Sequence, residues 1–187
     1  MYSHIESHNE LFTTVVVDLK HFAELYISTS TEKSFYVTDE KQSGEYKDAL
    51  ILNTQIRNDT LIITDPSSPV FKFPQDKLSA HKITDTRAQL IVPEHMNLFL
   101  NLVNSNLHMD GNFKEVVLNI HSGRVYFKQM SGNIKVVSVD AAISASGLKN
   151  YSFKATSRHG SVIVRSVTPN SNYLMQVESI YGNIQLD

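Results

Sequence analysis

The 187-residue chain contains no cysteine and no tryptophan, and only seven glycines and five prolines. The absence of cysteine excludes disulfide frameworks, thiolate metal ligands and cysteine nucleophiles. It leaves the compartment open, because a chain of this length can bury a core without disulfides. No apolar run approaches the roughly 18 residues of a membrane span, so no transmembrane segment is expected. With 41% hydrophobic and 19% charged residues, the composition is that of a globular protein.

A convincing helical periodicity is missing as well. The best candidate, residues 19–26, is short, has no capping residue and is equally typical of a turn between strands. Valine and isoleucine total 31 residues against 24 for alanine plus leucine, a balance that favours strands. Alternation with period two predicts strands near 12–18, 24–28, 34–38, 48–56, 60–64, 83–92 and 98–103. The sequence therefore predicts an all-β fold.

Proline and glycine are unevenly distributed. Four of the five prolines precede residue 110, and three of them, Pro66, Pro69 and Pro74, lie in one segment. Since proline cannot donate to a strand ladder, we expect a loop at 66–77. We interpret the chain as one all-β domain over 1–187, with N-terminal strands at about 10–65 and repeats over 83–187.

A short glycine-based phrase recurs in the second half. It reads SGRVYF at 122–127, SGNIKV at 131–136, HGSVIV at 159–164 and YGNIQL at 181–186, with a fainter copy at 110–113. Counted from residue 111, the glycines at 132, 160 and 182 follow at intervals of 21, 28 and 22 residues. Repeats of about 20–50 residues are typical of stacked architectures. We expect structural turn glycines, at corners that need positive φ, at Gly111, Gly123, Gly132, Gly147, Gly160 and Gly182.

The repeats favour a β-solenoid, in which inward residues such as Val116, Leu118 and Ile120 stack on those of the next turn. A β-sandwich with glycine turns stays an alternative, because the repeat spacing varies.

Four motifs also carry a family resemblance. They are NDTLII at 58–63, LIVP at 90–93, GNF at 111–113 and VESIYGNI at 177–184. In this order they resemble the bacterial β-strand-repeat family of putative adhesins, a domain of unknown function (DUF4097), over about residues 10–187. The resemblance implies an irregular right-handed solenoid preceded by N-terminal strands. It also implies export, since such proteins commonly carry a signal peptide or membrane anchor. The family has no established catalytic residues to carry over.

The sequence contains little that indicates reaction chemistry. Its histidines lack the spacing of three or four converging zinc ligands, and we interpret them as surface or corner residues. There is no nucleophile elbow and no phosphate-binding glycine loop. After residue 110 the carboxylates are too few for a polysaccharide-cleaving face. We therefore predict no catalytic, cofactor-binding or metal-binding residue and no enzymatic activity. The histidines are His4, His8, His21, His81, His95, His108, His121 and His159.

The charges divide the chain into an acidic and a basic part. Residues 1–110 carry nine basic and fifteen acidic side chains, whereas residues from 111 onward carry eight and four. The basic part could attract an anionic glycan or an acidic protein, although a solvated face kept for solubility is the simpler interpretation. Nucleic acid is not expected as a partner, because no RNA-binding aromatic motif accompanies the charge. The candidate anionic-ligand residues are Arg124, Lys128, Lys135, Lys154, Arg158 and Arg165.

Two aromatic and terminal features complete the sequence. Tyr126, Tyr151, Tyr173 and Tyr181 could form a sugar-stacking strip, although packing at corners is the default. The last residues still have a strand pattern and no cap follows, so we predict a homodimer or end-to-end contact through the C-terminal strand.

The favoured function is a non-enzymatic, adhesin-like interaction protein of the cell surface or envelope. The alternative is a carbohydrate-binding or polysaccharide-cleaving β-helix protein that uses the basic face, and a cytoplasmic protein scaffold is a third hypothesis. We expect an extracytoplasmic location if a signal peptide precedes Met1, and a cytoplasmic one otherwise.

Overall fold

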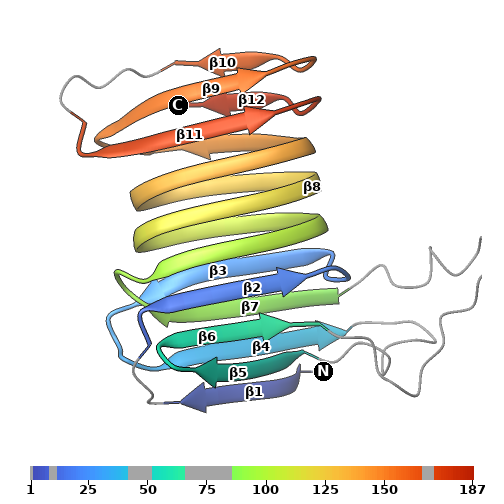
Figure 1. The fold of residues 1–187 in the computed structure, drawn as a ribbon, viewed down its shortest axis with the longest axis vertical. Coiled ribbons are helices and arrows are strands. Elements are labelled where there is room, and N and C mark those ends of the chain that lie inside the picture. Colours follow the sequence, from blue (N-terminus) through green and yellow to red (C-terminus); the bar gives the residue numbers. More distant parts are fainter. Residues whose placement is uncertain (1, 9–11, 42–51, 66–85, 166–170) are drawn as a thin grey trace, which may run out of the picture.

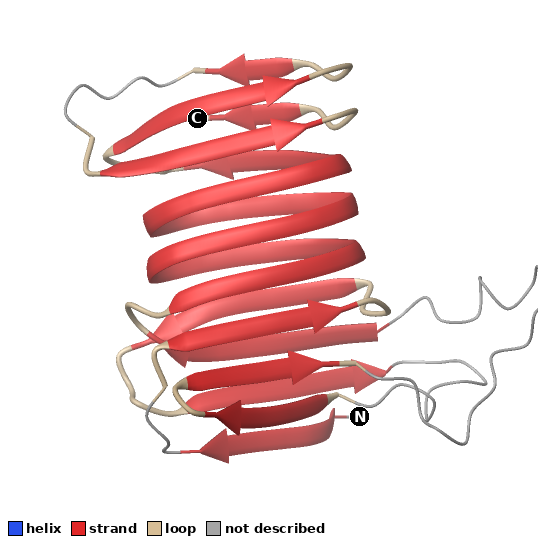
Figure 2. Cartoon of the chain, in the orientation of Figure 1, coloured by secondary structure: helices blue, strands red, loops and turns tan. Residues whose placement is uncertain are grey.

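The computed structural model of the chain describes residues 2–8, 12–41, 52–65, 86–165 and 171–187 (Figure 1). Every regular element in these ranges is a β-strand, which confirms the predicted all-β fold (Figure 2). These ranges therefore hold no helix of the length and apolarity needed to cross a membrane. The predicted proline-rich loop at 66–77 lies outside the described residues.

The strands follow one another along the chain with short connections where both ends are described. They are β1 Tyr2–His8, β2 Thr14–Leu19, β3 Glu24–Ser30, β4 Phe35–Lys41, β5 Asn53–Arg57, β6 Thr60–Thr64, β7 Thr86–Pro93, β8 Asn97–Ser146, β9 Tyr151–Ser157, β10 Val162–Val164, β11 Tyr173–Ser179 and β12 Ile184–Leu186. The helical candidate at 19–26 is the end of β2, a turn and the start of β3. Alternation had already favoured this reading over a helix.

The 50-residue strand β8 bends repeatedly and winds through successive turns that lie on one another (Figure 1). Hydrogen bonds join residues of neighbouring turns at nearly constant sequence separation. Asn119 Nδ2 donates to Asn101 Oδ1 at 3.0 Å, 18 residues away, and Ser144 Oγ donates to Val125 O at 3.3 Å, 19 residues away. One turn of the chain is thus 18 to 19 residues long.

Strand pairing arranges these turns into two continuous ladders of one curled, mixed sheet. Ladder A runs β5–β6–β2–β8–β11–β9, and ladder B runs β1–β4–β7–β3–β8–β12–β10. The pairs are parallel except for β5–β6, β1–β4 and β4–β7. Because β2 and β3 pair directly with β8, the N-terminal strands belong to the same stack as the repeats.

The core lies between the two ladders. Within the strands, buried residues alternate with exposed ones, as the period of a strand requires. Val116, Leu118 and Ile120 are 0%, 0% and 3% exposed, so the predicted inward residues do point inward. Residues 18 positions apart, such as Leu118 and Val136, occupy the same inward position on neighbouring turns and are both buried.

The order of the last strands differs from their order in the sequence. β11 pairs with β8 on one side and β9 on the other, and β12 lies likewise between β8 and β10. The chain therefore makes its outermost turn with β9 and β10 and then returns to insert β11 and β12 beneath them (Figure 1). The C-terminal strand is consequently not an open edge, and the prediction of a contact through it is wrong on this point.

A column of small residues lets successive turns approach at one corner. A Cβ atom built on Gly123 would overlap the backbone of Ser105, one on Gly182 would overlap Ala141, and one on Gly160 would overlap Gly182. Gly123 also has a φ of 120°, which L side chains rarely adopt. The close approach of the turns therefore depends on the absence of a side chain at these positions.

The glycine phrase marks both corners, which explains its irregular spacing. The copies at 122–127 and 131–136 begin nine residues apart, about half a turn, and lead into ladder B and ladder A respectively. The spacings of 21, 28 and 22 residues are therefore not the length of a turn. They mix half-turns with the detour that inserts the last strands.

Replacing Gly123 by alanine should be far more destabilising than replacing Gly147. Gly123→Ala places a methyl group against the Ser105 backbone at a strained φ, whereas Gly147 has a φ of 67° and open space around it. We expect a loss of about 3 kcal/mol for Gly123→Ala and about 1 kcal/mol for Gly147→Ala in urea unfolding. Equal losses would contradict the backbone contact at this corner.

Tyr151 should make stability depend on alkaline pH. Its side chain is fully buried and its hydroxyl donates to Gly132 O at 2.6 Å, and burial raises the pKa of the phenol above the usual 10.0. Above pH 10 the unfolded chain ionises this group while the folded chain keeps it neutral, so its contribution to stability falls. Tyr151→Phe should cost about 1–2 kcal/mol at neutral pH, and the difference from wild type should shrink above pH about 10 in unfolding titrations. A constant difference would contradict this account.

Candidate functional site

The six candidate basic residues are exposed but do not share one face. Lys135 and Lys154 lie in one outward row of ladder A, each paired with Gln176 between them. Arg124 and Lys128 belong to the part of β8 that forms ladder B, and Arg165 follows β10 in the same ladder. Arg158 lies at a corner after β9. A single continuous anionic-ligand face is therefore not formed by these residues.

The outer surface of ladder B carries an aromatic stack instead. Tyr26 of β3, His108 and Tyr126 lie on three successive turns, with both pairs of ring centroids 4.7 Å apart and interplanar angles of 10° and 17°. The two tyrosines are 39% and 38% exposed, because alternate residues of the same strands fill the core. Offset stacking of this kind is favourable by about 0.5–1.5 kcal/mol per pair. We call these three residues the aromatic stack.

A cleft of about 450 Å³ lies along the aromatic stack. Ser144, one turn beyond Tyr126, is too small to continue the stack, and its hydroxyl is turned to Val125 O. A second outward row beside the rings brings Asp110, Lys128 and Ser146 into the lining. We call this space the Tyr126 cleft.

The Tyr126 cleft can hold a ligand through several kinds of contact. Its rings offer apolar surface, the Asp110 carboxylate accepts hydrogen bonds, and the Lys128 ammonium donates them. Ligand sites typically combine apolar and aromatic walls with a few polar groups, in volumes of roughly 300–1,000 Å³. Glu24 is near the other end of the stack, where it accepts a hydrogen bond from Tyr26 OH at 3.2 Å. Burial, and then the Glu24 charge, raise the pKa of Tyr26, so this phenol stays a neutral donor.

Two other clefts are less well equipped. One of about 280 Å³ on ladder A is lined mainly by apolar surface, with Asn101, Asn119 and Val137 in its wall. The other, of about 320 Å³, lies between the turn after β3 and the turn after β7, beside Phe12 and Met96. The described lining of neither combines stacked aromatic rings with a carboxylate and an ammonium group.

The histidines occupy separate places in the fold. His108 is in the aromatic stack, and His159 stacks on Tyr181 with centroids 5.1 Å apart. His21 lies beside Asp65, and His121 is in the wall of the ladder A cleft. Among the described residues, no group of three histidine, aspartate or glutamate side chains is placed to hold a metal ion. His81 lies outside the described residues.

The predicted tyrosine strip is not formed. Tyr126 is on the outer surface of ladder B, whereas Tyr151 is fully buried and Tyr173 is half-buried against it, with ring centroids 5.4 Å apart. The sequence analysis missed Tyr26 as a member of the site, because it contacts His108 across 82 residues of chain. The period-two pattern does place both side chains outward, but it does not say which strands become neighbours.

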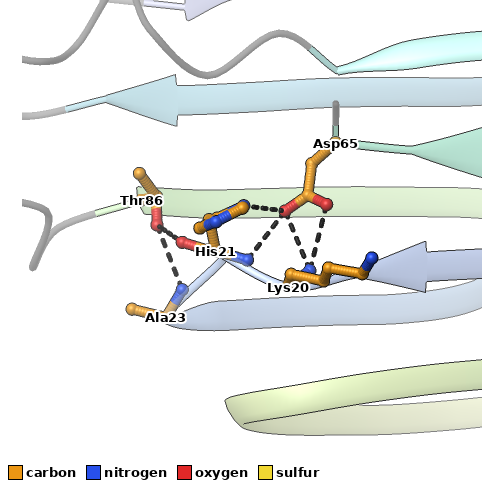
Figure 3. Close-up of polar contacts among 5 residues, drawn as sticks. All are labelled: Lys20, His21, Ala23, Asp65 and Thr86. Atoms are coloured by element: carbon orange, nitrogen blue, oxygen red, sulfur yellow. Dashed lines mark hydrogen bonds and ion pairs between the residues drawn. The ribbon is translucent and has the colours of Figure 1, made fainter. Parts of the chain in front are cut away.

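Asp65 is a buried carboxylate with a structural role (Figure 3). Its side chain is 2% exposed and accepts hydrogen bonds from the backbone N–H of Lys20 at 2.9 Å and of His21 at 2.7 Å. His21 Nδ1 lies 3.4 Å from the same carboxylate. Across the turn, Thr86 Oγ1 donates to His21 O at 2.8 Å and accepts from Ala23 N. Asp65 and Thr86 thus hold the turn between β2 and β3.

The fold and cleft together define an all-β protein with a curled mixed sheet and an outward-facing candidate binding site. No protein-family model matches the chain, and no curated protein matches its sequence. Among solved structures, a "putative cell adhesion protein" from Clostridium sporogenes is similar, with a TM-score of 0.60 and 13% identity over 98% of each chain. At this identity the likeness shows the fold alone.

Other solved structures align over most of the chain with lower scores. A "putative adhesin" from Bacteroides fragilis has a TM-score of 0.39 and 7% identity, over 98% of this chain and 96% of its own. A "putative lipid binding protein" from Parabacteroides distasonis has a TM-score of 0.36 and 12% identity over the same shares. These scores are too low to indicate a shared fold.

Removing the Asp65 carboxylate should destabilise the protein. Asp65→Ala leaves the N–H groups of Lys20 and His21 without their acceptor, so we expect a loss of about 2–3 kcal/mol in urea unfolding. Asp59→Ala is the control, because Asp59 is exposed and its carboxylate bonds the Thr13 hydroxyl; it should cost less than about 1 kcal/mol. Similar losses for both variants would contradict the role assigned to Asp65.

Proposed function

We propose that this chain is a non-enzymatic, adhesin-like interaction module of the cell surface or envelope, and that it binds its ligand in the Tyr126 cleft. The observation that supports the proposal is the cleft itself, where stacked rings, a carboxylate, an ammonium group and serine hydroxyls meet on an exposed face. The similarity in fold to a solved structure named a cell adhesion protein is consistent with this role. The same similarity favours an extracytoplasmic location.

We further propose an irregular right-handed β-solenoid as the architecture. The constant separation of 18 to 19 residues between bonded turns supports it, as do the parallel ladders. A scaffold of this kind displays outward side chains in straight rows, one residue per turn. Such rows suit the recognition of extended or repetitive ligands.

A carbohydrate is the ligand class that best fits the cleft. A sugar ring has apolar C–H faces that pack on aromatic rings and hydroxyls that bond to carboxylate, amide and serine groups. Asp110, Ser146 and Gln89 supply such partners in the lining. Lys128 favours a sugar that also carries an acidic substituent.

Binding is a better account than cleavage. Glycoside hydrolysis generally requires two carboxyl groups about 5–9.5 Å apart across the bond. Among the described residues that line the Tyr126 cleft, Asp110 is the single carboxylate. The proposal therefore assigns Asp110 to hydrogen bonding with the ligand rather than to proton transfer.

The test is a glycan array followed by titration of the best glycan by NMR. Tyr126→Ala should weaken binding by about tenfold or more, because the ring supplies the main apolar contact. Ser144→Phe should have a similar effect by filling the cleft beside Tyr126. Lys128→Ala should weaken binding of acidic glycans more than of neutral ones.

Tyr181→Ala is the matched control. Tyr181 is also an exposed tyrosine, 55% accessible, that stacks on a histidine, but it lies away from the Tyr126 cleft. Its removal should leave binding unchanged. Equal effects of Tyr126→Ala and Tyr181→Ala would contradict the proposed site, and new reducing ends in glycan released from the protein would contradict a purely binding function.

A further inference from the structure

The two ends of the stack have open strand edges. Among the described residues, β9 pairs with β11 alone and β10 pairs with β12 alone, so they form one end. At the other end β5 pairs with β6 alone and β1 pairs with β4 alone. Figure 1 shows these two pairs of strands at opposite ends of the long axis. We call them the β9–β10 end and the β1–β5 end.

The backbone of β10 presents unused hydrogen-bonding groups at its edge. Arg165 N donates to Leu186 O at 2.9 Å, and Ser161 O accepts from Ile184 N at 2.8 Å. Because peptide groups alternate between the two sides of a strand, the N–H and C=O groups of Val162 and Val164 point away from β12. Such an edge is a template for another strand.

The side chains of β10 are apolar and exposed. Val162, Ile163 and Val164 are 39%, 43% and 38% accessible. The two valines are in line with Ile184 and Leu186, which are buried at 1% and 0% because a further strand covers them. The β9–β10 end thus exposes the top of a core that each preceding turn covers for the one below it.

The two ends also carry opposite charge. Residues 147–165, which form the outermost turn, contain four lysine or arginine residues and no aspartate or glutamate. Residues 1–65, which form β1–β6, contain five basic and eleven acidic residues. The stack therefore has a basic end and an acidic end.

From these observations we propose that the β9–β10 end docks on the β1–β5 end of a second copy of this chain. The stacks then align end to end, so that β9 lies beside β5 and β10 beside β1, and each ladder continues into the next molecule. In this arrangement β9 meets β5 antiparallel, because β5 runs opposite to the rest of ladder A, and β10 meets β1 in parallel. Opposite charges meet at the joint, whereas joining two β9–β10 ends would bring two basic turns together.

A contact between unlike ends does not close on itself. Each added molecule offers a fresh β9–β10 end, so the assembly grows beyond a dimer. A molecule with a blocked β9–β10 end can still bind through its β1–β5 end, and it then stops growth. This asymmetry separates the proposal from a two-fold dimer.

The test is sedimentation velocity of the full chain over a concentration series at low and high salt. Wild type should form species larger than a dimer at low salt and dissociate as salt screens the joint. Val164→Pro should abolish growth, because proline removes an edge N–H while the bonds from Ser161 and Arg165 to β12 remain. Added to wild type, Val164→Pro should shorten the assemblies in proportion to its amount.

A charge-reversal pair gives a second route that does not alter the backbone. Lys154→Glu/Arg158→Glu should weaken association by about tenfold or more at low salt. Arg124→Glu/Lys135→Glu is the control, because it makes the same charge change at exposed positions in the middle of the stack. It should leave association unchanged.

Several results would overturn the proposal. They are a monomer at all concentrations and salts, assembly that stops at a dimer, equal effects of the two charge reversals, and failure of folded Val164→Pro to shorten wild-type assemblies. Circular dichroism establishes that each variant is folded. Capture of an acidic peptide by a chain that does not self-associate would also contradict the second copy as the partner. None of these results depends on the Tyr126 cleft, so they leave the glycan proposal separately testable.

Discussion

The structure depends on the close contact of successive turns at the corner formed by Ser105, Gly123, Ala141, Gly182 and Gly160. At this column the backbone of one turn lies where the next turn has no room for a Cβ atom. Contact at this distance fixes how far apart the turns are and how they are aligned along the strand direction. The 18-to-19-residue period, the inward stacking of Leu118 on its neighbours and the continuous ladders all follow from that alignment.

The same alignment builds the outer surface. Once the turns are in register, an outward residue faces the residue one turn away, so Tyr26, His108 and Tyr126 meet as a stack although two of them are 82 residues apart. A serine at 144 ends the stack and opens the Tyr126 cleft. Binding chemistry can therefore change through outward residues alone, while the inward residues and the small-residue corner keep the scaffold.

The sequence predicted the parts of the fold that follow from local rules. Alternation gave the all-β fold and the inward positions of Val116, Leu118 and Ile120, and glycine marked the corners. It did not predict that the phrase marks two corners per turn, because half-turns and full turns look alike in one dimension. Nor did it predict that β11 and β12 lie beneath β9 and β10, since strand order is decided by long-range pairing. The aromatic stack was missed for the same reason, and the basic residues were grouped by sequence rather than by ladder.

The register of neighbouring turns is the central claim, and disulfide formation between introduced cysteines tests it most directly because the natural chain has none. Asn101 and Asn119 are hydrogen-bonded through their side chains on adjacent turns, and Val137 lies 18 residues further along. Adjacent strands are about 4.8 Å apart and a disulfide spans at most about 7 Å between Cα atoms, so it reaches one turn but not two. Asn101→Cys/Asn119→Cys should form an intramolecular disulfide on mild oxidation, and Asn101→Cys/Val137→Cys should not. Bridging of the second pair, or of neither, would contradict the stacked register.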